Sequence, residues 1–343
     1  MRARPESSNL FSVTTASLPT RPLTAELHLT ELGLGAAQFG NLNRETTDEA
    51  SDAAVATAWD TGIRYFDTAP YYGAGLSERR LGHALAQRPR EEYVLSTKVG
   101  RLLQPSPETA HLRNPDFVVP ADPIPVWDFS RDGVHRSIEH SLTRLGLDRI
   151  DIAYLHDPDD HWEQASTSGV AALKELRDQG VLGAIGTGMN QSAMPTAFVR
   201  EHGIDVVMWA GRLTLLDQSS LADLLPAVRE TGARIVAAGV YNSGILANPE
   251  VPESAHYNYA DAPVELLERA RQIAAIAARH GLTLPEAAIQ FCLAFDDVAS
   301  VVIGTRTAEH VTSAVQRYQA EAPAQLWEEL VAAGLLAALP NTF

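Results

Sequence analysis

The sequence predicts an α/β protein built as one (β/α)8 barrel, the TIM barrel. Short β-rich runs alternate with segments of helical periodicity, and we count eight strands, each followed by a helix. Parallel strands need crossover connections, which such an alternation supplies. The length of 343 residues suits a single barrel, and no stretch resembles an interdomain linker. An open doubly wound sheet is the competing fold.

Each expected strand is a short apolar run. The eight strands are expected at 32–37, 63–66, 93–96, 150–155, 182–186, 205–209, 234–238 and 298–303. We expect one barrel domain over 21–340, preceded by a flexible segment over 1–20. The Pro-rich, polar stretch at about 102–132 is expected to be a loop inserted after the third strand.

The expected helices show apolar residues at helical spacing between start and stop signals. Thr46 or Thr47 is placed to cap the first helix, Gly62 to end it, and Ser77 to cap the second. The later helices are expected at 134–145, 169–179, 193–202, 220–231, 263–280, 284–294, 307–319 and 323–337.

Composition narrows the function classes. The chain holds 27 Lys and Arg against 43 Asp and Glu, a formal net charge of −16, which disfavours binding to nucleic acid or an anionic membrane. Cys292 is the single cysteine, so no intrachain disulfide can form. We find no secretory signal and no apolar run long enough to span a membrane, and we expect a cytoplasmic protein.

Polar residues stand where four of the strands end. Asp67, Lys98, His156 and Asn190 follow different strands, and Tyr72 lies in the loop five residues after Asp67. All carboxyl ends of barrel strands lie on one face, so these side chains are expected to converge. A nearby ammonium lowers the pKa of a phenol, and a neutral imidazole can orient a substrate oxygen. This set suits proton transfer at an alcohol or carbonyl, with a nicotinamide as hydride partner.

Two other interpretations of these residues stay open. Lys98 could form a Schiff base, as in a barrel aldolase. The segment 156–161, His-Asp-Pro-Asp-Asp-His, has the composition of a metal site but fits a tight polar loop better, so we predict no metal.

Several segments carry a family resemblance. Residues 66–73 (FDTAPYYG), 77–82 (SERRLG) and 145–151 (LGLDRID), leading into His156, resemble the aldo-keto reductase family. Residues 126–133, 156–160, 188–191 and 241–246 resemble its branch of sugar dehydrogenases, together with relatives that oxidise pyridoxal. The resemblance runs from about 32 to 320 and implies a barrel enzyme that uses NAD or NADP.

The resemblance also implies residue roles. Asp67, Tyr72, Lys98 and His156 match the family's catalytic tetrad, with Tyr72 as acid or base. Asn190 matches the residue that holds the nicotinamide carboxamide. The expected contacts to the rest of the cofactor are Tyr241, Asn242, Ser243, Gly244 and Leu246 around the pyrophosphate, and Gly304, Thr305 and Arg306 at the adenosine end. Trp209 or Tyr241 is the candidate to stack on the nicotinamide. Departures from the family pattern near Arg306 favour NAD over NADP.

The expected activity is oxidation of the anomeric hydroxyl of an aldose, such as L-fucose, L-galactose or D-arabinose, to the lactone. Trp127, Asp128 and Phe129 in the insertion are candidate sugar contacts, although plain loop anchoring explains them equally well. The alternatives are a pyridoxal dehydrogenase or general aldehyde reductase, and a non-catalytic, cofactor-binding regulatory subunit. We expect a small-molecule partner and a monomer or loose homo-oligomer.

Overall fold

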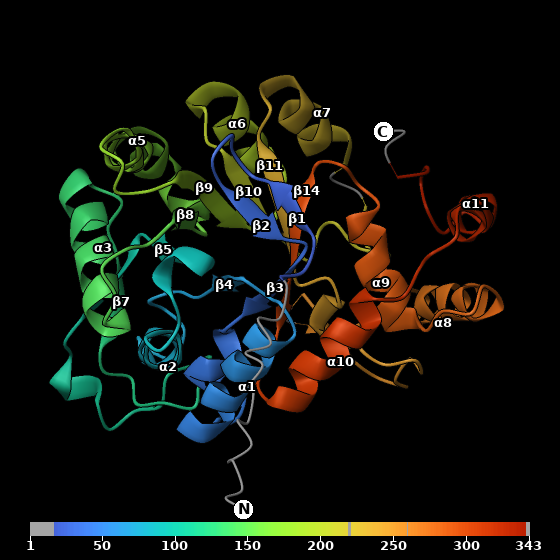
Figure 1. Ribbon diagram of the computed structural model, residues 1–343, viewed down its shortest axis with the longest axis horizontal. Coiled ribbons are helices and arrows are strands. Elements are labelled where there is room, and N and C mark those ends of the chain that lie inside the picture. Colours follow the sequence, from blue (N-terminus) through green and yellow to red (C-terminus); the bar gives the residue numbers. More distant parts are fainter. Residues whose placement is uncertain (1–16, 219–220, 259, 341–343) are drawn as a thin grey trace, which may run out of the picture.

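The computed structural model describes residues 17–218, 221–258 and 260–340 (Figure 1). Eight parallel strands close into a barrel, which confirms the predicted fold. In barrel order they are β3 (Leu32–Gly35), β4 (Tyr65–Asp67), β5 (Val94–Val99), β8 (Ile152–His156), β9 (Ala184–Met189), β10 (Val206–Ala210), β11 (Arg234–Ala238) and β14 (Val298–Gly304). Most of the segment predicted to be flexible, residues 1–16, lies outside the described residues.

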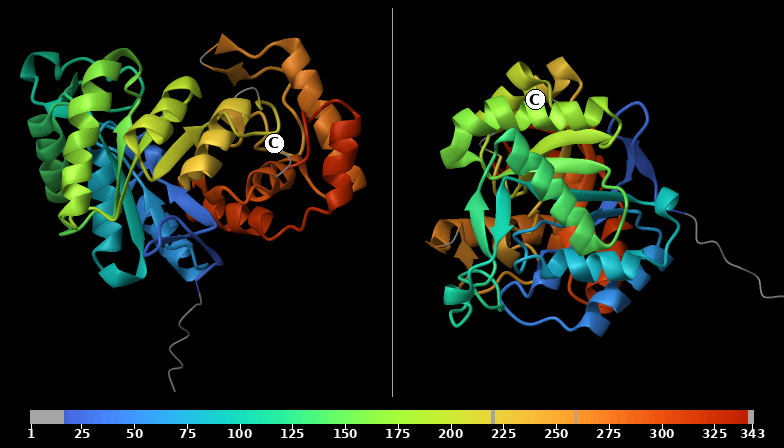
Figure 2. Two further views of the ribbon diagram at one scale, coloured as in Figure 1. Left: turned by 90° about the horizontal axis from the view of Figure 1, so that it is seen from above. Right: turned by 90° about the vertical axis from the view of Figure 1, so that its left-hand side faces the viewer.

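Helices surround the barrel. They are α1 (Asp48–Asp60), α2 (Leu76–Leu85), α3 (Arg131–Leu145), α4 (Trp162–Gln164), α5 (Val170–Asp178), α6 (Ala193–His202), α7 (Leu221–Thr231), α8 (Val264–Arg279), α9 (Leu284–Leu293), α10 (Ala308–Tyr318) and α11 (Ala324–Ala332). Two of them, α8 and α11, pack on each other at the periphery, beyond α9 (Figures 1 and 2). No helix in the described part of the chain has the length and apolar character needed to cross a bilayer.

The two N-cap predictions have different outcomes. Thr47 caps α1, since its side chain accepts a hydrogen bond from the Ala50 amide. The prediction for Ser77 is wrong, because α2 begins at Leu76 and its N-cap residue is Gly75. The φ of 83° at Gly75 suits a residue without Cβ. The Ser77 hydroxyl instead donates to the Ala36 carbonyl at 2.7 Å, which ties α2 to the loop after β3.

Apolar side chains form two layers. One fills the barrel interior and includes Tyr65, Tyr154 and Met208, and the other lies between the barrel and the helices. A hairpin of β1 (Thr20–Pro22) and β2 (His28–Thr30), which the sequence pattern did not predict, adds Leu23 and Leu29 to the interior layer. It lies across one end of the barrel (Figure 1) and closes that end.

The insertion after β5 is more ordered than predicted. Within it, β6 (Arg101–Gln104) pairs antiparallel with β7 (Ile124–Trp127), and the hairpin stands at the edge of the barrel (Figure 2, right). Gly100 joins β5 to β6 with a φ of 103°, and a Cβ there would lie 2.0 Å from the Phe129 ring. Only glycine fits this turn, which sets where β6 begins.

Candidate active site

The predicted tetrad converges at the carboxyl ends of three neighbouring strands. Asp67, Lys98 and His156 lie on β4, β5 and β8, where Asp67 pairs in register with Ser96 and Lys98 with Tyr154. Tyr72 returns to them on the turn after β4. Close packing holds this turn in place, because a Cβ on Gly73 would lie 2.3 Å from the Gly40 carbonyl oxygen.

Asp67 and Lys98 form a buried ion pair. The Lys98 Nζ donates to Asp67 Oδ2 at 2.7 Å and to the Thr68 carbonyl at 3.0 Å, and Ser96 donates to the other carboxylate oxygen at 2.7 Å. Burial lowers the pKa of Lys98, but Asp67 and Tyr72 raise it more, so the pKa lies above its ordinary value. The lysine is therefore a fixed positive charge.

Tyr72 lies beside that charge, with the Lys98 Nζ 4.7 Å from its ring centroid. Burial raises the pKa of Tyr72, and Lys98 opposes this as expected, but the pKa remains above that of a free phenol. Tyr72 is thus a phenol whose proton Lys98 helps to release, so it can act as an acid or, once deprotonated, as a base.

His156 completes the group as a neutral imidazole. Its ring is perpendicular to that of Tyr72, with 5.9 Å between the centroids. Burial, followed by Arg101 and Lys98, holds the pKa of His156 well below its ordinary value. Its Nδ1 is buried and has no hydrogen-bond partner among the described residues.

A chain of hydroxyls lies beneath Asp67 inside the barrel. The Tyr65 hydroxyl is 3.1 Å from that of Ser96 and 3.0 Å from that of Tyr154. These buried groups fix Ser96, which in turn holds the Asp67 carboxylate. We did not predict this network, because a tyrosine in a β-rich run reads as an ordinary core residue.

Sequence reasoning also missed several residues at the mouth. The Arg101 guanidinium lies between the rings of Tyr71 and Trp127, with its carbon 4.5 Å from each centroid. Its Nη2 donates to Asp157 Oδ2 at 2.6 Å. Phe117, from the insertion, packs edge-on against Tyr71. The side chains become neighbours only when the insertion folds back over the barrel.

The three candidate sugar contacts have different surroundings. Trp127 is 41% exposed at the mouth. Asp128 accepts hydrogen bonds from Ser130 and Arg136 at the start of α3. Phe129 is fully buried beneath Gly100, so its ring offers no face to a ligand.

The predicted nicotinamide and pyrophosphate contacts lie on loops after β9 and β11. Asn190 is exposed, and its carbonyl accepts a hydrogen bond from Arg212, which the sequence analysis did not single out. Asn242, Ser243 and Gly244 form a turn in which all three φ angles are positive. Leu246 is fully buried and its amide donates to the Tyr241 carbonyl, so it has no free donor.

The two candidates for stacking on the nicotinamide differ in exposure, because Trp209 is buried and Tyr241 is half-buried. Trp209 is fully buried, and its indole nitrogen donates to the Gln191 carbonyl at 3.1 Å. The Tyr241 hydroxyl contacts Arg317, whose guanidinium carbon lies 5.6 Å from the tyrosine ring centroid.

The end of β14 and the loop after it hold the three residues expected at the adenosine end, which have different environments. Gly304 is exposed, and a Cβ there would lie 2.6 Å from the Gln38 amide nitrogen. Thr305 follows it directly. The Arg306 guanidinium donates to the carbonyls of Leu42, Arg44 and Glu45 and to the Thr46 hydroxyl, so it braces the loop before α1.

Buried polar atoms without partners make these loops suitable for a dinucleotide. Asn242 Oδ1, Thr305 Oγ1 and Gln38 Oε1 are buried and have no hydrogen-bond partner among the described residues. Such atoms are rare unless a ligand or water satisfies them. The residues present therefore fit a nicotinamide dinucleotide, to which Asn242, Thr305 and Gln38 would offer hydrogen bonds.

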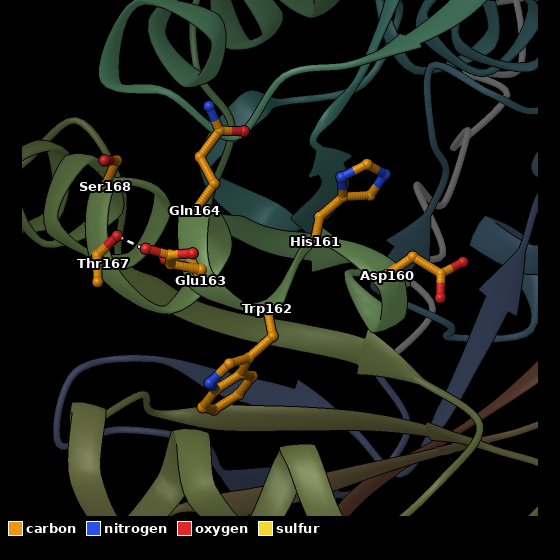
Figure 3. Close-up of a pocket in the computed structure, with 7 residues that line it drawn as sticks. All are labelled: Asp160, His161, Trp162, Glu163, Gln164, Thr167 and Ser168. Atoms are coloured by element: carbon orange, nitrogen blue, oxygen red, sulfur yellow. Dashed lines mark hydrogen bonds between the residues drawn. The ribbon is translucent and has the colours of Figure 1, made fainter.

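The segment 156–161 contains no metal cluster, and no group of three His, Cys, Asp or Glu residues within the described ranges could hold a metal ion. Asp159 accepts a hydrogen bond from Gln191, and the His161 ring lies 4.7 Å from that of Trp127. A pocket of about 420 Å³ opens beside this segment (Figure 3), lined by Asp160, His161, Trp162, Glu163, Gln164, Thr167 and Ser168. None of the tetrad residues lines it.

Comparisons with known proteins agree with this geometry. The model of the Aldo/keto reductase family matches residues 31–334. The chain is 47% identical over 320 residues to a D-threo-aldose 1-dehydrogenase from a Pseudomonas species, covering 91% of this chain and 96% of the relative. It is 37% identical to a pyridoxal 4-dehydrogenase from Microbacterium luteolum, covering 90% and 95%.

A solved structure supports the same assignment. The holo form of an aldo-keto reductase from Bacillus halodurans superposes with a TM-score of 0.74 at 25% identity, covering 95% of this chain and 99% of that one. These matches and the closed barrel show that the chain belongs to the Aldo/keto reductase family and is an NAD(P)-dependent oxidoreductase.

Proposed function

We propose that the enzyme oxidises the anomeric hydroxyl of an aldose, of the L-fucose, L-galactose or D-arabinose type, to the corresponding lactone. The observation that carries the proposal is the buried Asp67–Lys98 pair beside Tyr72, with neutral His156 facing the same ring. The similarity to a D-threo-aldose 1-dehydrogenase supports the substrate class.

The residues divide the proton chemistry among themselves. For oxidation, Tyr72 must first release its phenolic proton to solvent, a step that the Lys98 charge favours. The phenolate then accepts the proton of the C1 hydroxyl as the C1 carbonyl forms. Asp67 keeps Lys98 charged and in place. His156 orients the sugar oxygen by hydrogen bonding. A bound oxidised nicotinamide supplies the acceptor for the hydride that leaves C1.

The cofactor contacts favour NAD over NADP. Asn190 would hold the carboxamide, the 242–244 turn the pyrophosphate, and Gly304 and Thr305 the adenosine end. Arg306 is the residue that could bind a 2′-phosphate, but its Nη atoms already donate to loop carbonyls. We therefore expect a higher kcat/KM with NAD.

Formation of reduced nicotinamide, followed by its absorbance, tests the proposal. The purified enzyme is incubated with NAD or NADP and a panel of L-fucose, L-galactose, D-arabinose and pyridoxal. Turnover of at least one aldose supports the proposal, and turnover of pyridoxal with no aldose overturns it. Higher activity with NADP would contradict the cofactor preference.

Oxidation or reduction of an aromatic substrate is the second candidate. The rings of Tyr71, Phe117 and Trp127 around the mouth favour it, as does similarity to a pyridoxal 4-dehydrogenase. The pyridoxal arm of the same panel measures it. We retain the predictions of a cytoplasmic enzyme and of a monomer or loose homo-oligomer, and size-exclusion chromatography of the full chain tests the second.

A further inference from the structure

Arg101 lies at the edge of the tetrad, in contact with two aromatic rings. It is the first residue of β6, in register with Trp127 on β7, and the rings of Trp127 and Tyr71 hold its guanidinium on both sides. Contact with two aromatic rings restricts the movement of the guanidinium and its N–H donors. The side chain is nevertheless not sealed off, because it remains 16% exposed.

Asp157 places a carboxylate next to Arg101 and directly after His156. Its φ of 42° is uncommon for a residue with a side chain, and its amide donates to the Gly188 carbonyl at 3.0 Å. The carboxylate lies 3.7 Å from His156 Nε2 and is 36% exposed. A ligand bound to Asp157 therefore reaches the tetrad.

The two side chains, which we call the mouth pair, have unused hydrogen-bonding capacity. A guanidinium offers five N–H donors and a carboxylate about four acceptor positions, yet a single hydrogen bond joins these two groups. Within the described residues neither group has another hydrogen-bond partner, and the Arg101 Nε is buried without one. Donors and acceptors thus stand side by side at the mouth.

This arrangement matches a neutral diol better than an anion. Each hydroxyl of two adjacent C–OH groups both donates and accepts a hydrogen bond, as a paired arginine and aspartate require. An anionic group would meet the carboxylate as well as the guanidinium, and the charges of the pair cancel. The Trp127 side chain beside the pair is 41% exposed, so its uncovered part can contact sugar C–H groups.

We propose that the mouth pair is the specificity-determining site for the aldose: it binds two adjacent hydroxyls away from C1 and selects neutral sugars over those with a carboxylate or phosphate. This inference rests on the proposed function and names the part of the substrate that the tetrad does not contact.

The test measures KM and kcat for Arg101→Gln and Asp157→Asn with the best aldose and with deoxy analogues that each lack one hydroxyl. Loss of hydrogen bonds to a charged group predicts a KM increase of roughly 10- to 100-fold with little change in kcat. In the wild type, removing a recognised hydroxyl from the sugar should raise KM. In the variants the same removal should raise KM far less, because the partner of that hydroxyl is already gone. Arg101→Lys, which keeps the charge without the planar donors, should recover part of the loss.

A charge readout makes the test sharper. Asp157→Asn leaves Arg101 unpaired, so relative activity should shift from the neutral aldose toward the uronic acid with the same stereochemistry. The matched control is Arg90→Gln, which removes an arginine of another ion pair outside the mouth. It should leave KM unchanged, and fluorescence titration should give wild-type cofactor affinity for every variant.

Wild-type KM values in both mouth-pair variants, with an active wild type, would overturn this inference alone. A wild type that turns over no aldose would overturn the proposed function and this inference with it. Hydroxyl recognition would also be contradicted if the substitutions raised KM more for the deoxy analogues than for the full sugar.

Discussion

Strands β5 and β8 have an arginine–aspartate pair at each end, and the two pairs differ in what else they bind. The mouth pair, Arg101 and Asp157, follows the strands, while Arg90 and Asp151, which we call the floor pair, precede them. Each pair has an N–O distance of 2.6 Å, and each arginine carbon lies 4.5 Å from a tyrosine ring centroid. The ion pair and the arginine–tyrosine contact therefore have nearly the same geometry at both ends of the strands.

The surroundings separate the two pairs. Asp151 also accepts hydrogen bonds from the Leu95 amide and the Arg149 side chain, and Arg90 donates to two backbone carbonyls. The Asp151 side chain is 10% exposed, against 36% for Asp157. The protein itself satisfies the floor pair, whereas the mouth pair has room for a ligand. The comparison shows that an ion pair indicates a binding site only when its donors and acceptors are not all used by hydrogen bonds within the protein.

The largest effect should come from the tyrosine at the mouth, compared with a tyrosine at the floor. Tyr72→Phe removes the proposed acid–base group, and turnover should fall roughly 10²- to 10⁴-fold while cofactor binding persists. Tyr93→Phe is the matched control at the floor, because the Tyr93 hydroxyl is buried and has no partner in the described structure. Steady-state rates and fluorescence titration measure both. Wild-type activity in Tyr72→Phe would remove Tyr72 from the mechanism.

Removal of each aspartate should separate stability from specificity. Asp151→Ala leaves Arg90 partly buried and unpaired, so the free energy of unfolding should fall by about 3–5 kcal/mol. Asp157→Ala should cost no more than about 1 kcal/mol, because that pair is partly exposed and screened by solvent. Urea unfolding measures both. Equal losses would mean that the mouth pair is structural after all.

The smallest expected effect is a shift in pH dependence. Burial, Arg101 and Lys98 hold the pKa of His156 well below its ordinary value, so the ring stays neutral through mildly acidic pH. Arg101→Gln removes one of these causes, so the acid limb of kcat/KM should move to higher pH. Arg90→Gln should leave the limb in place, and a shift there would contradict a local electrostatic cause.

The same pKa also affects stability, with a definite sign. The unfolded chain protonates His156 below its ordinary pKa of about 6.5, while the folded protein resists protonation. The contribution of His156 to stability is therefore complete above that pH. It is lost as pH falls from there toward the lower pKa of the folded state.

Sequence reasoning predicted the bounds of several elements. The strand Arg234–Ala238 has the predicted bounds, and the helix predicted at 193–202 is α6. It missed the β1–β2 and β6–β7 hairpins, whose strands span at most four residues and each of which has a proline in one strand. It also predicted that the helix before β9 begins at residue 169. The helical segment begins earlier, at Trp162, because a π-helical turn, Ala165–Gly169, joins α4 to α5.

The candidate site divides in the same way. The tetrad residues could be proposed because each stands where a barrel strand ends or just beyond. Arg101 and Asp157 could not, since Arg101 begins a hairpin read as loop and Asp157 reads as a turn residue. The long-range packing of Arg101 between Tyr71 and Trp127 has no periodic signal.

The sequence by itself determined the barrel and its reactive end, because eight parallel βα units place every carboxyl strand end on one side. Only the tertiary structure decided which charges serve the protein and which stay open to a ligand. Arg306 looked available for a phosphate until the loop before α1 supplied its acceptors. Asp157 looked like a turn residue until Arg101 was found beside it. Hydrogen-bond satisfaction depends on neighbours distant in sequence, which a local pattern does not encode.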